Sequence, residues 1–209
     1  MPLQNRVDPW GILQSVPARG AWLGNRGILH DENKQVVAPW RHKSWVTCKL
    51  EFQGRKREIF SPGKYSELFF LDEATALSAG HRPCAECRRE RYNEFKAIWC
   101  AANLENGSST DISVAQIDKQ LHMERAVRGG GKVTYRTDFG AVPAGAFIEI
   151  GGGAFLLWQG RLHQWSVHGY SPSNLVPSQL DVVTMLTPAS IVRVLQHGFR
   201  PQVHESASG

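Results

Sequence analysis

Apolar and polar positions change their spacing several times along the chain, and each spacing predicts a different element. The first forty residues mix Gly, Pro, Asn and Trp without a regular apolar period, which predicts loops and short extended pieces. From residue 45, the runs SWVTCKLEF and REIF flank a connection that contains Gly54, and this arrangement predicts a β-hairpin. The run YSELFFL predicts a third strand. Cys48 therefore falls on the first strand of the expected hairpin.

Helix signals follow these strands. Asp72 precedes the run EATALSA and can cap a short helix, which Gly80 can end in the left-handed conformation. A longer helix is expected over residues 85–101, because its apolar residues recur at helical spacing. After a polar linker, Asp111 or Ser113 can cap a third helix in VAQIDKQLHMERAV.

The second half of the chain carries short apolar or alternating runs separated by glycines and by a loop rich in Pro and Ser. These runs predict a mainly antiparallel sheet. A last helix is expected in LTPASIVRVLQHGFRP, with Thr187 as N-cap and Gly198 as its stop. We therefore predict an α+β protein with a β-hairpin and helix in residues 1–103, and a linker, helix, mainly β region and C-terminal helix in residues 104–209.

Composition and charge set broad limits on function. The 209 residues are enough for one large or two small globular domains. The opening MPLQNRVDPWG has no apolar run behind a charged start, and no later apolar run approaches membrane-spanning length. We therefore expect a cytoplasmic protein without a membrane. The 24 Lys and Arg against 19 Asp and Glu give a formal net charge of +5, which permits a phosphate-bearing partner without requiring one.

Four cysteines, Cys48, Cys84, Cys87 and Cys100, carry the most specific chemistry. In a reducing compartment, closely spaced cysteines indicate metal binding or catalysis rather than disulfides. Cys84 and Cys87 form a CxxC at a helix entrance, where backbone amides and nearby arginines favour thiolates. Zinc is the leading interpretation, and a redox pair or simply packed thiols are the alternatives. Cys100 lies about 20 Å further along the helix, too far to share the ion.

A structural zinc site needs four ligands in a tetrahedron. Cys48 supplies the third thiolate if the hairpin returns the chain to the CxxC. His42 is the first choice for the fourth ligand, because it precedes Cys48 on the same arm and two ligands per arm is the usual arrangement. His81, His30 and His122 are further candidates.

The segment FFLDEATALSAGHRPCAEC resembles the second half of the metal-binding module of Ada-type DNA-alkylation repair and regulatory proteins, and related zinc-bearing nuclease tails. In that module, an A..AG.RPC..C pattern delivers two cysteines to zinc. The resemblance implies that Cys84 and Cys87 are ligands and that Cys48 corresponds to an upstream one. The Ada-type module has a close cysteine pair upstream, where this sequence has only Cys48. The whole chain also resembles a bacterial protein family without an assigned activity.

Basic residues surround the cysteines in the sequence, in the segments WRHKSW, GRKRE and CRRERY. Such runs occur both on solvated surfaces and on nucleic-acid interfaces. We expect phosphate contacts to DNA or RNA from Arg55, Arg57, Arg88, Arg89 and Arg91. The leading function is therefore binding, with a structural zinc ion that positions an arginine-rich face.

A function of another class is open. Histidines and acidic residues can bind a catalytic divalent ion, and His30, Asp31, His122 and Glu124 are the residues that a metal-dependent nuclease or other hydrolase would use. The sequence does not decide between a binding protein and an enzyme. A binder should show salt-sensitive association without turnover, whereas a nuclease should degrade DNA or RNA with magnesium or manganese.

Overall fold

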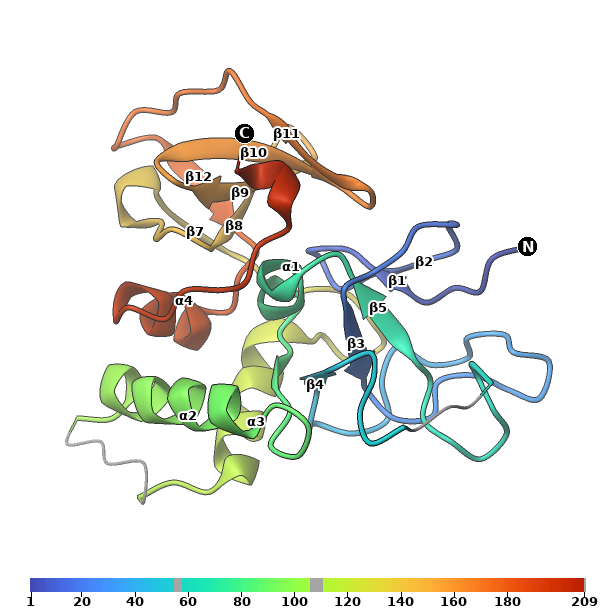
Figure 1. Ribbon diagram of the computed structural model, residues 1–209. Coiled ribbons are helices and arrows are strands. Elements are labelled where there is room, and N and C mark those ends of the chain that lie inside the picture. The colour runs from blue at the N-terminus through green and yellow to red at the C-terminus, as the bar shows by residue number, and fades with distance from the viewer. Residues whose placement is uncertain (55–57, 106–110, 209) are drawn as a thin grey trace.

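The fold is that of a computed structural model, which describes residues 1–54, 58–105 and 111–208. These residues form four α-helices and two six-stranded, mostly antiparallel sheets. The predicted α+β class is therefore confirmed. Figure 1 shows the two sheets in different parts of the molecule, with the helices between and beside them.

The first sheet has the strand order β2-β1-β5-β3-β4-β6. Its strands are β1 (Arg6–Val7), β2 (Leu13–Gln14), β3 (Trp22–Asn25), β4 (Val46–Cys48), β5 (Leu68–Phe70) and β6 (Arg82–Pro83). The predicted hairpin between β4 and REIF is wrong, because β4 pairs antiparallel with β3 and parallel with β6. Residue 57 of REIF and the connection at 55–56 lie outside the described residues, and Phe60 has φ +59° and stacks on His30, which is not an extended strand conformation.

The second sheet has the strand order β11-β10-β9-β8-β12-β7, and its pairings are all antiparallel. Its strands are β7 (Tyr135–Asp138), β8 (Phe147–Ile150), β9 (Gly153–Trp158), β10 (Arg161–Ser166), β11 (Gly169–Pro172) and β12 (Val182–Met185). Antiparallel pairing agrees with the alternating runs expected in the second half of the chain.

The helices follow their capping signals closely. They are α1 (Glu73–Ser78), α2 (Arg89–Asn103), α3 (Val114–Arg125) and α4 (Ala189–Gln196). Asp72 caps α1 by accepting a hydrogen bond from the Thr75 amide, and Gly80 has φ +87°, both as predicted. Ser113 and Gln116 form a capping box on α3. Within the three described stretches, no helix has both the length and the apolar character that a membrane crossing requires.

Two helix starts differ from the prediction. The N-cap of α4 is Pro188 rather than Thr187, whose hydroxyl accepts a hydrogen bond from the Phe147 amide at 2.9 Å instead. That bond ties the start of α4 to β8. The long helix α2 begins at Arg89, so the CxxC lies in the turn before the helix rather than inside it.

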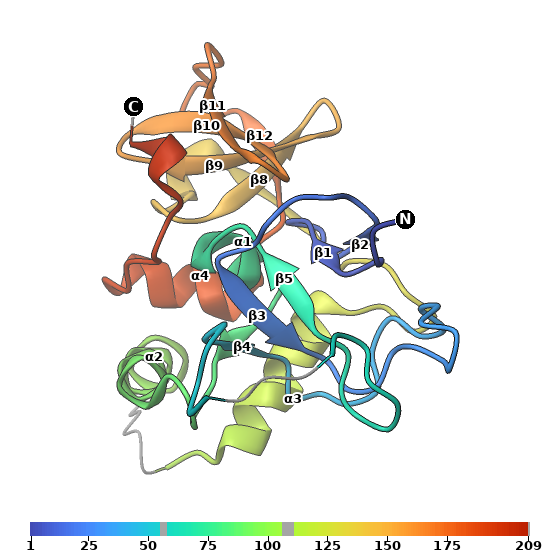
Figure 2. The same ribbon diagram turned by 45° about the vertical axis from the view of Figure 1, so that its right-hand side comes forward.

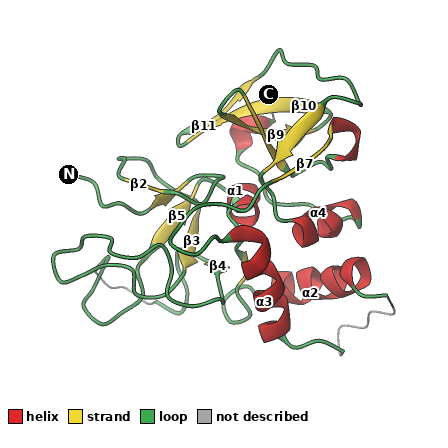
Figure 3. Cartoon of the chain, turned by 180° about the vertical axis from the view of Figure 1, so that it is seen from behind, coloured by secondary structure: helices red, strands yellow, loops and turns green. Residues whose placement is uncertain are grey.

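The largest hydrophobic cluster draws residues from both sides of the division predicted at residue 103. Phe95 and Trp99 on α2 share it with Leu121 on α3, Ile148 on β8 and Leu195 on α4. Figures 2 and 3 show the helices gathered beside the sheets, with α1 close to both. Both predicted regions therefore contribute to this cluster, which packs α2 against elements of the second half of the chain.

Candidate metal centre

The sulfur atoms of Cys48, Cys84 and Cys87 lie within 4.8 Å of one another. Parallel pairing sets Thr47 on β4 opposite Pro83 on β6, so Cys48 and Cys84 follow at neighbouring strand ends. Cys87 comes one turn later, just before α2. Sulfurs bound to one tetrahedral ion through bonds of about 2.3 Å lie about 3.8 Å apart. The three side chains can therefore reach a common ion with small movements, and their predicted convergence is confirmed.

Backbone amides point at these sulfurs. The Glu86 amide donates to Cys84 Sγ at 3.4 Å, and the amides of Cys87 and Lys49 act on Cys84 and Cys87 respectively. N–H donors of this kind favour thiolate over thiol. The turn that carries the CxxC therefore supplies hydrogen bonds to the charged form of its own ligands.

The three thiols hold their protons unequally. The hydrogen bond from Cys48 lowers the pKa of Cys84 to about 5, with help from the backbone amides and against the effect of burial. That same bond, followed by burial, raises the pKa of Cys48, and burial raises the pKa of Cys87. One thiolate is thus stable at neutral pH by itself. Three thiolates so close together need a cation between them.

The cluster lies at the protein surface, because Cys48 and Cys84 are partly exposed while Cys87 is buried. Cys100 is fully buried in the largest hydrophobic cluster and does not belong to the group. This separation agrees with the distance expected along α2. A metal ion could therefore reach the three sulfurs from solvent.

The expected histidine ligand is not part of the group that the described residues form. His42 is exposed and lies against Gly27, where its Cδ2 would be 3.2 Å from an added Cβ. His81, next to the CxxC in sequence, is fully buried, and its Nε2 accepts from Arg26 Nε at 3.1 Å. In the described part of the chain, no histidine, aspartate or glutamate joins the three sulfurs. Among the described residues, the candidate ligand group therefore consists of the three sulfurs.

The residues considered for hydrolysis are not brought together. His30 is buried and bonded to Ser66 at 2.6 Å, and Asp31 accepts backbone bonds in its own turn. Although His122 and Glu124 share α3, His122 packs edge-on against an aromatic ring, while Glu124 accepts bonds from the start of α4. No three of these side chains come together as a metal-binding group in the described residues.

The arginine-rich face predicted beside the cysteines needs correction. Arg88 is 5% exposed, forms a 2.6 Å ion pair with Glu73 and lies 3.8 Å over the Trp22 ring. Arg91 pairs with the other Glu73 oxygen at 2.7 Å and lies over the Phe199 ring. A buried carboxylate has thus drawn both guanidinium groups inward. Arg88 is therefore closed to phosphates, and Arg91 is largely engaged within the protein.

Basic side chains nevertheless remain on the surface near the cluster. Arg89 is exposed, as the prediction requires, and so is Lys49, which follows Cys48 directly. The predicted contacts Arg55 and Arg57 lie outside the described residues. The exposed basic groups that flank the sulfurs are therefore Lys49 and Arg89.

Sequence patterns did not indicate a second group of charged side chains that the structure brings together. Arg26 and Arg125 are each 2% exposed, and their guanidinium carbons lie 4.2 Å and 4.3 Å from the Trp45 ring centroid. Neither arginine belongs to a basic run, and nearly a hundred positions separate them in the sequence, so no local pattern marks them. Only the tertiary structure brings them to the same tryptophan.

Comparison of this chain with protein-family models, with curated proteins and with solved structures gives no match. The three sulfurs are the arrangement with the most specific chemistry among the described side chains.

Proposed function

We propose that this chain is a zinc-binding protein that holds one Zn²⁺ through Cys48, Cys84 and Cys87 and contacts nucleic acid through exposed basic residues beside the ion. The approach of the three sulfurs to within 4.8 Å carries the proposal. Thiolate ligands favour zinc over hard cations such as magnesium or calcium. The Ada-type pattern around the CxxC supports the same ligands.

The ion has a structural role in this proposal. It would join the ends of β4 and β6 to the turn before α2. Local support there is weak, since β6 has only two residues and the N-cap of α2, Arg88, makes no capping hydrogen bond through its side chain. Metal binding to such a site contributes directly to folding free energy. Loss of the ion should therefore loosen the end of β4, which Lys49 follows, and the turn before α2, which Arg89 follows.

The proposed nucleic-acid contact rests on charge and position. Lys49 and Arg89 are exposed and flank the ligands, and the chain carries a formal net charge of +5. Phosphate contacts from such residues give affinity and orientation without reading sequence. The proposal covers both DNA and RNA, since neither residue is placed to discriminate between them.

Metal analysis of purified variants tests the zinc site. Wild-type protein and Cys100→Ala should carry about one zinc per chain, whereas Cys84→Ser should lose the metal. Cobalt reconstitution should produce a thiolate-to-cobalt charge-transfer band in wild type and in Cys100→Ala. A wild-type protein that is folded but binds neither ion after reconstitution would overturn the proposal.

Fluorescence anisotropy with labelled single-stranded and double-stranded oligonucleotides tests the partner. Replacing Lys49 and Arg89 with alanine should weaken binding and reduce the salt slope by about one for each phosphate that the variant no longer neutralises. Lys64 and Arg161 are also exposed, and their double alanine variant is the charge-matched control. Equal weakening in both double variants, or no binding at low salt, would exclude this interface. Degradation with magnesium or manganese would favour the nuclease instead.

A further inference from the structure

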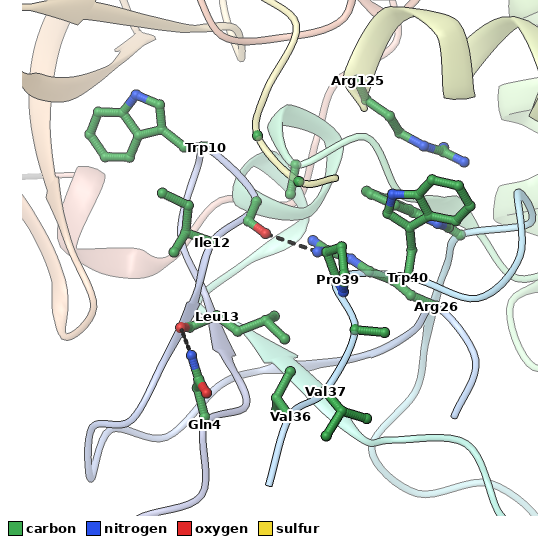
Figure 4. Close-up of a pocket in the computed structure, with 16 residues that line it drawn as sticks. Gln4, Trp10, Ile12, Leu13, Arg26, Val36, Val37, Pro39, Trp40 and Arg125 are labelled. Atoms are coloured by element: carbon green, nitrogen blue, oxygen red, sulfur yellow. Dashed lines mark hydrogen bonds between the residues drawn. The ribbon is translucent and has the colours of Figure 1, made fainter. Parts of the chain in front are cut away.

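A cavity of about 350 Å³ lies between the first loops of the chain, the segment 36–40 and the glycine-rich loop 129–131. The cysteines do not line it. Its walls are mostly apolar and include Trp10, Ile12, Leu13, Val36, Pro39 and Trp40. Figure 4 shows Trp10, Ile12 and Leu13 on one side, and Pro39 and Trp40 on the other, with Arg26 and Arg125 near Trp40. The volume is that of a small-molecule site.

One wall of this cavity carries a buried guanidinium with spare donors. Arg26 is 2% exposed; its Nε donates to His81 and its Nη1 donates to the Gly11 carbonyl at 2.8 Å (Figure 4). Its Nη2 has no hydrogen-bond partner among the described residues. That nitrogen would lie 3.4 Å from a Cβ added at Gly11, which itself lines the cavity. Nη2 has almost no accessible surface, so its unused N–H groups lie just behind the cavity wall at Gly11.

Two more cations share this environment. Arg125 also lines the cavity and donates to the carbonyls of Gly80 and Lys43, while Lys132 donates to a carbonyl at the end of α1. In the described part of the chain, no carboxylate lies within ion-pair distance of Arg26, Arg125 or Lys132. Burial lowers the pKa of both arginines to about 9. The buried carboxylates Asp8 and Asp118 act on these cations only from beyond ion-pair distance, so the cavity wall keeps a positive charge.

Such an arrangement is expensive for a fold to keep without a ligand. A buried charge is normally paired, and an unpaired N–H group in a low-dielectric environment raises the free energy of the folded state. The Trp45 ring and the carbonyl groups offset part of this for Arg26 and Arg125. They leave the Nη2 donors of Arg26 unused and out of contact with water, behind a largely apolar wall.

We propose that this cavity binds a small organic anion, with an aromatic or similarly flat apolar body between the Trp10 and Trp40 walls and one carboxylate or phosphate group hydrogen-bonded to Arg26 Nη2. A planar acid fits because guanidinium donors match its oxygens and indole rings contact its body. Carboxylate and phosphate monoester share this chemistry, so the choice between them is left to the measurement. The proposal is independent of the metal centre.

Isothermal titration calorimetry with three probes tests it. Phenylacetate and phenyl phosphate carry the anion on an aromatic body, and phenylacetamide is the neutral counterpart of the first. At least one anion should bind at least about tenfold more tightly than the amide, since hydrogen bonds to charged groups contribute that much in a buried site. Preference for one anion identifies its class. Equal binding of amide and acids, or no heat with either acid at millimolar concentration, would overturn the proposal.

Variants at the cavity rim keep the test clear of folding defects. Ile12 is 58% exposed, so Ile12→Glu and Ile12→Lys should both fold. The glutamate should reduce anion binding at least about fivefold relative to the lysine through repulsion at the entrance. Ile28→Glu makes the same charge change at a 43% exposed position that does not line the cavity, and it should bind like wild type. Identical binding by both Ile12 variants would overturn the placement of the anion in this cavity.

Discussion

Glu73 is the buried carboxylate that turns two of the predicted phosphate contacts into structural residues, and Glu73→Gln tests this. The side chain is 0% exposed and accepts from Arg88 at 2.6 Å, from Arg91 at 2.7 Å and from the Gln202 amide at 2.9 Å. Glutamine removes the charge and turns an NH₂ group toward donors. The Arg91 side chain is 18% exposed and would still pair with Glu94 in this variant, whereas the Arg88 side chain is only 3% exposed and has no comparable access to water.

The expected loss of folding stability follows because Glu73→Gln leaves the buried Arg88 charge without a counter-charge. Removing one partner of a buried ion pair destabilises a protein by about 3–5 kcal/mol, and the lower end applies because glutamine retains one acceptor oxygen. For a chain of this size, about 3 kcal/mol corresponds to a fall in Tm of roughly 6–12 °C. Urea unfolding followed by tryptophan fluorescence measures it, with Trp22 stacked on Arg88 as a local reporter.

Glu94→Gln is the matched control. Glu94 also pairs with Arg91, but its side chain is 47% exposed, so its loss should destabilise by less than about 1 kcal/mol. If Glu73→Gln were no less stable than Glu94→Gln, the reasoning would be refuted, and Arg88 and Arg91 would again count as candidate phosphate contacts.

The dependence of folding stability on acid pH provides an independent test of the role of Glu73. Burial by itself would raise the pKa of Glu73, but hydrogen bonds from Arg91 and the charges of Arg88 and Arg91 outweigh it and lower the pKa below its usual 4.5. The stabilisation from ionised Glu73 is therefore complete above about pH 4.5 and is lost as the pH falls through the lowered pKa. Wild type should lose stability in that acid range more steeply than Glu73→Gln.

Three further outcomes follow. Gly80→Ala should destabilise the protein by more than about 2 kcal/mol, because a Cβ at φ +87° would lie 2.3 Å from Arg125 Cδ. The control Gly63→Ala is also at positive φ but has open space, and it should destabilise by only about 1–2 kcal/mol. Equal urea midpoints for the two variants would contradict this. Burial and the charges of Arg26 and Arg125 lower the pKa of Lys132 to about 7, so between pH 7 and 9 the unfolded chain binds a proton there that the folded chain does not. The free energy of unfolding should therefore rise over this range by up to about 1.4 kcal/mol per pH unit. An unchanged slope in Lys132→Met would disprove it. A strong chelator should lower the Tm and make three thiols reactive toward a thiol reagent, and no change in either would count against a bound metal.

The local signals in the sequence were sufficient for much of the helical structure. Asp72 caps α1, Gly80 takes the left-handed conformation after it, and Ser113 opens α3, because capping and turn chemistry act over a few residues. The CxxC at a helix entrance pointed to Cys84 and Cys87 for the same reason. The third sulfur, Cys48, was inferred correctly although its predicted hairpin was wrong.

Long-range packing decided the rest. Which strand β4 pairs with, and where Arg88 finds its counter-charge, depend on residues that no short window contains. Arg26 and Arg125 meet at Trp45 only after β3 and α3 have packed beside the same ring. The sequence by itself determined the caps of α1 and α3 and the close spacing of Cys84 and Cys87, since those depend on neighbours along the chain. The tertiary structure decided which charges are buried, because burial depends on neighbours in space.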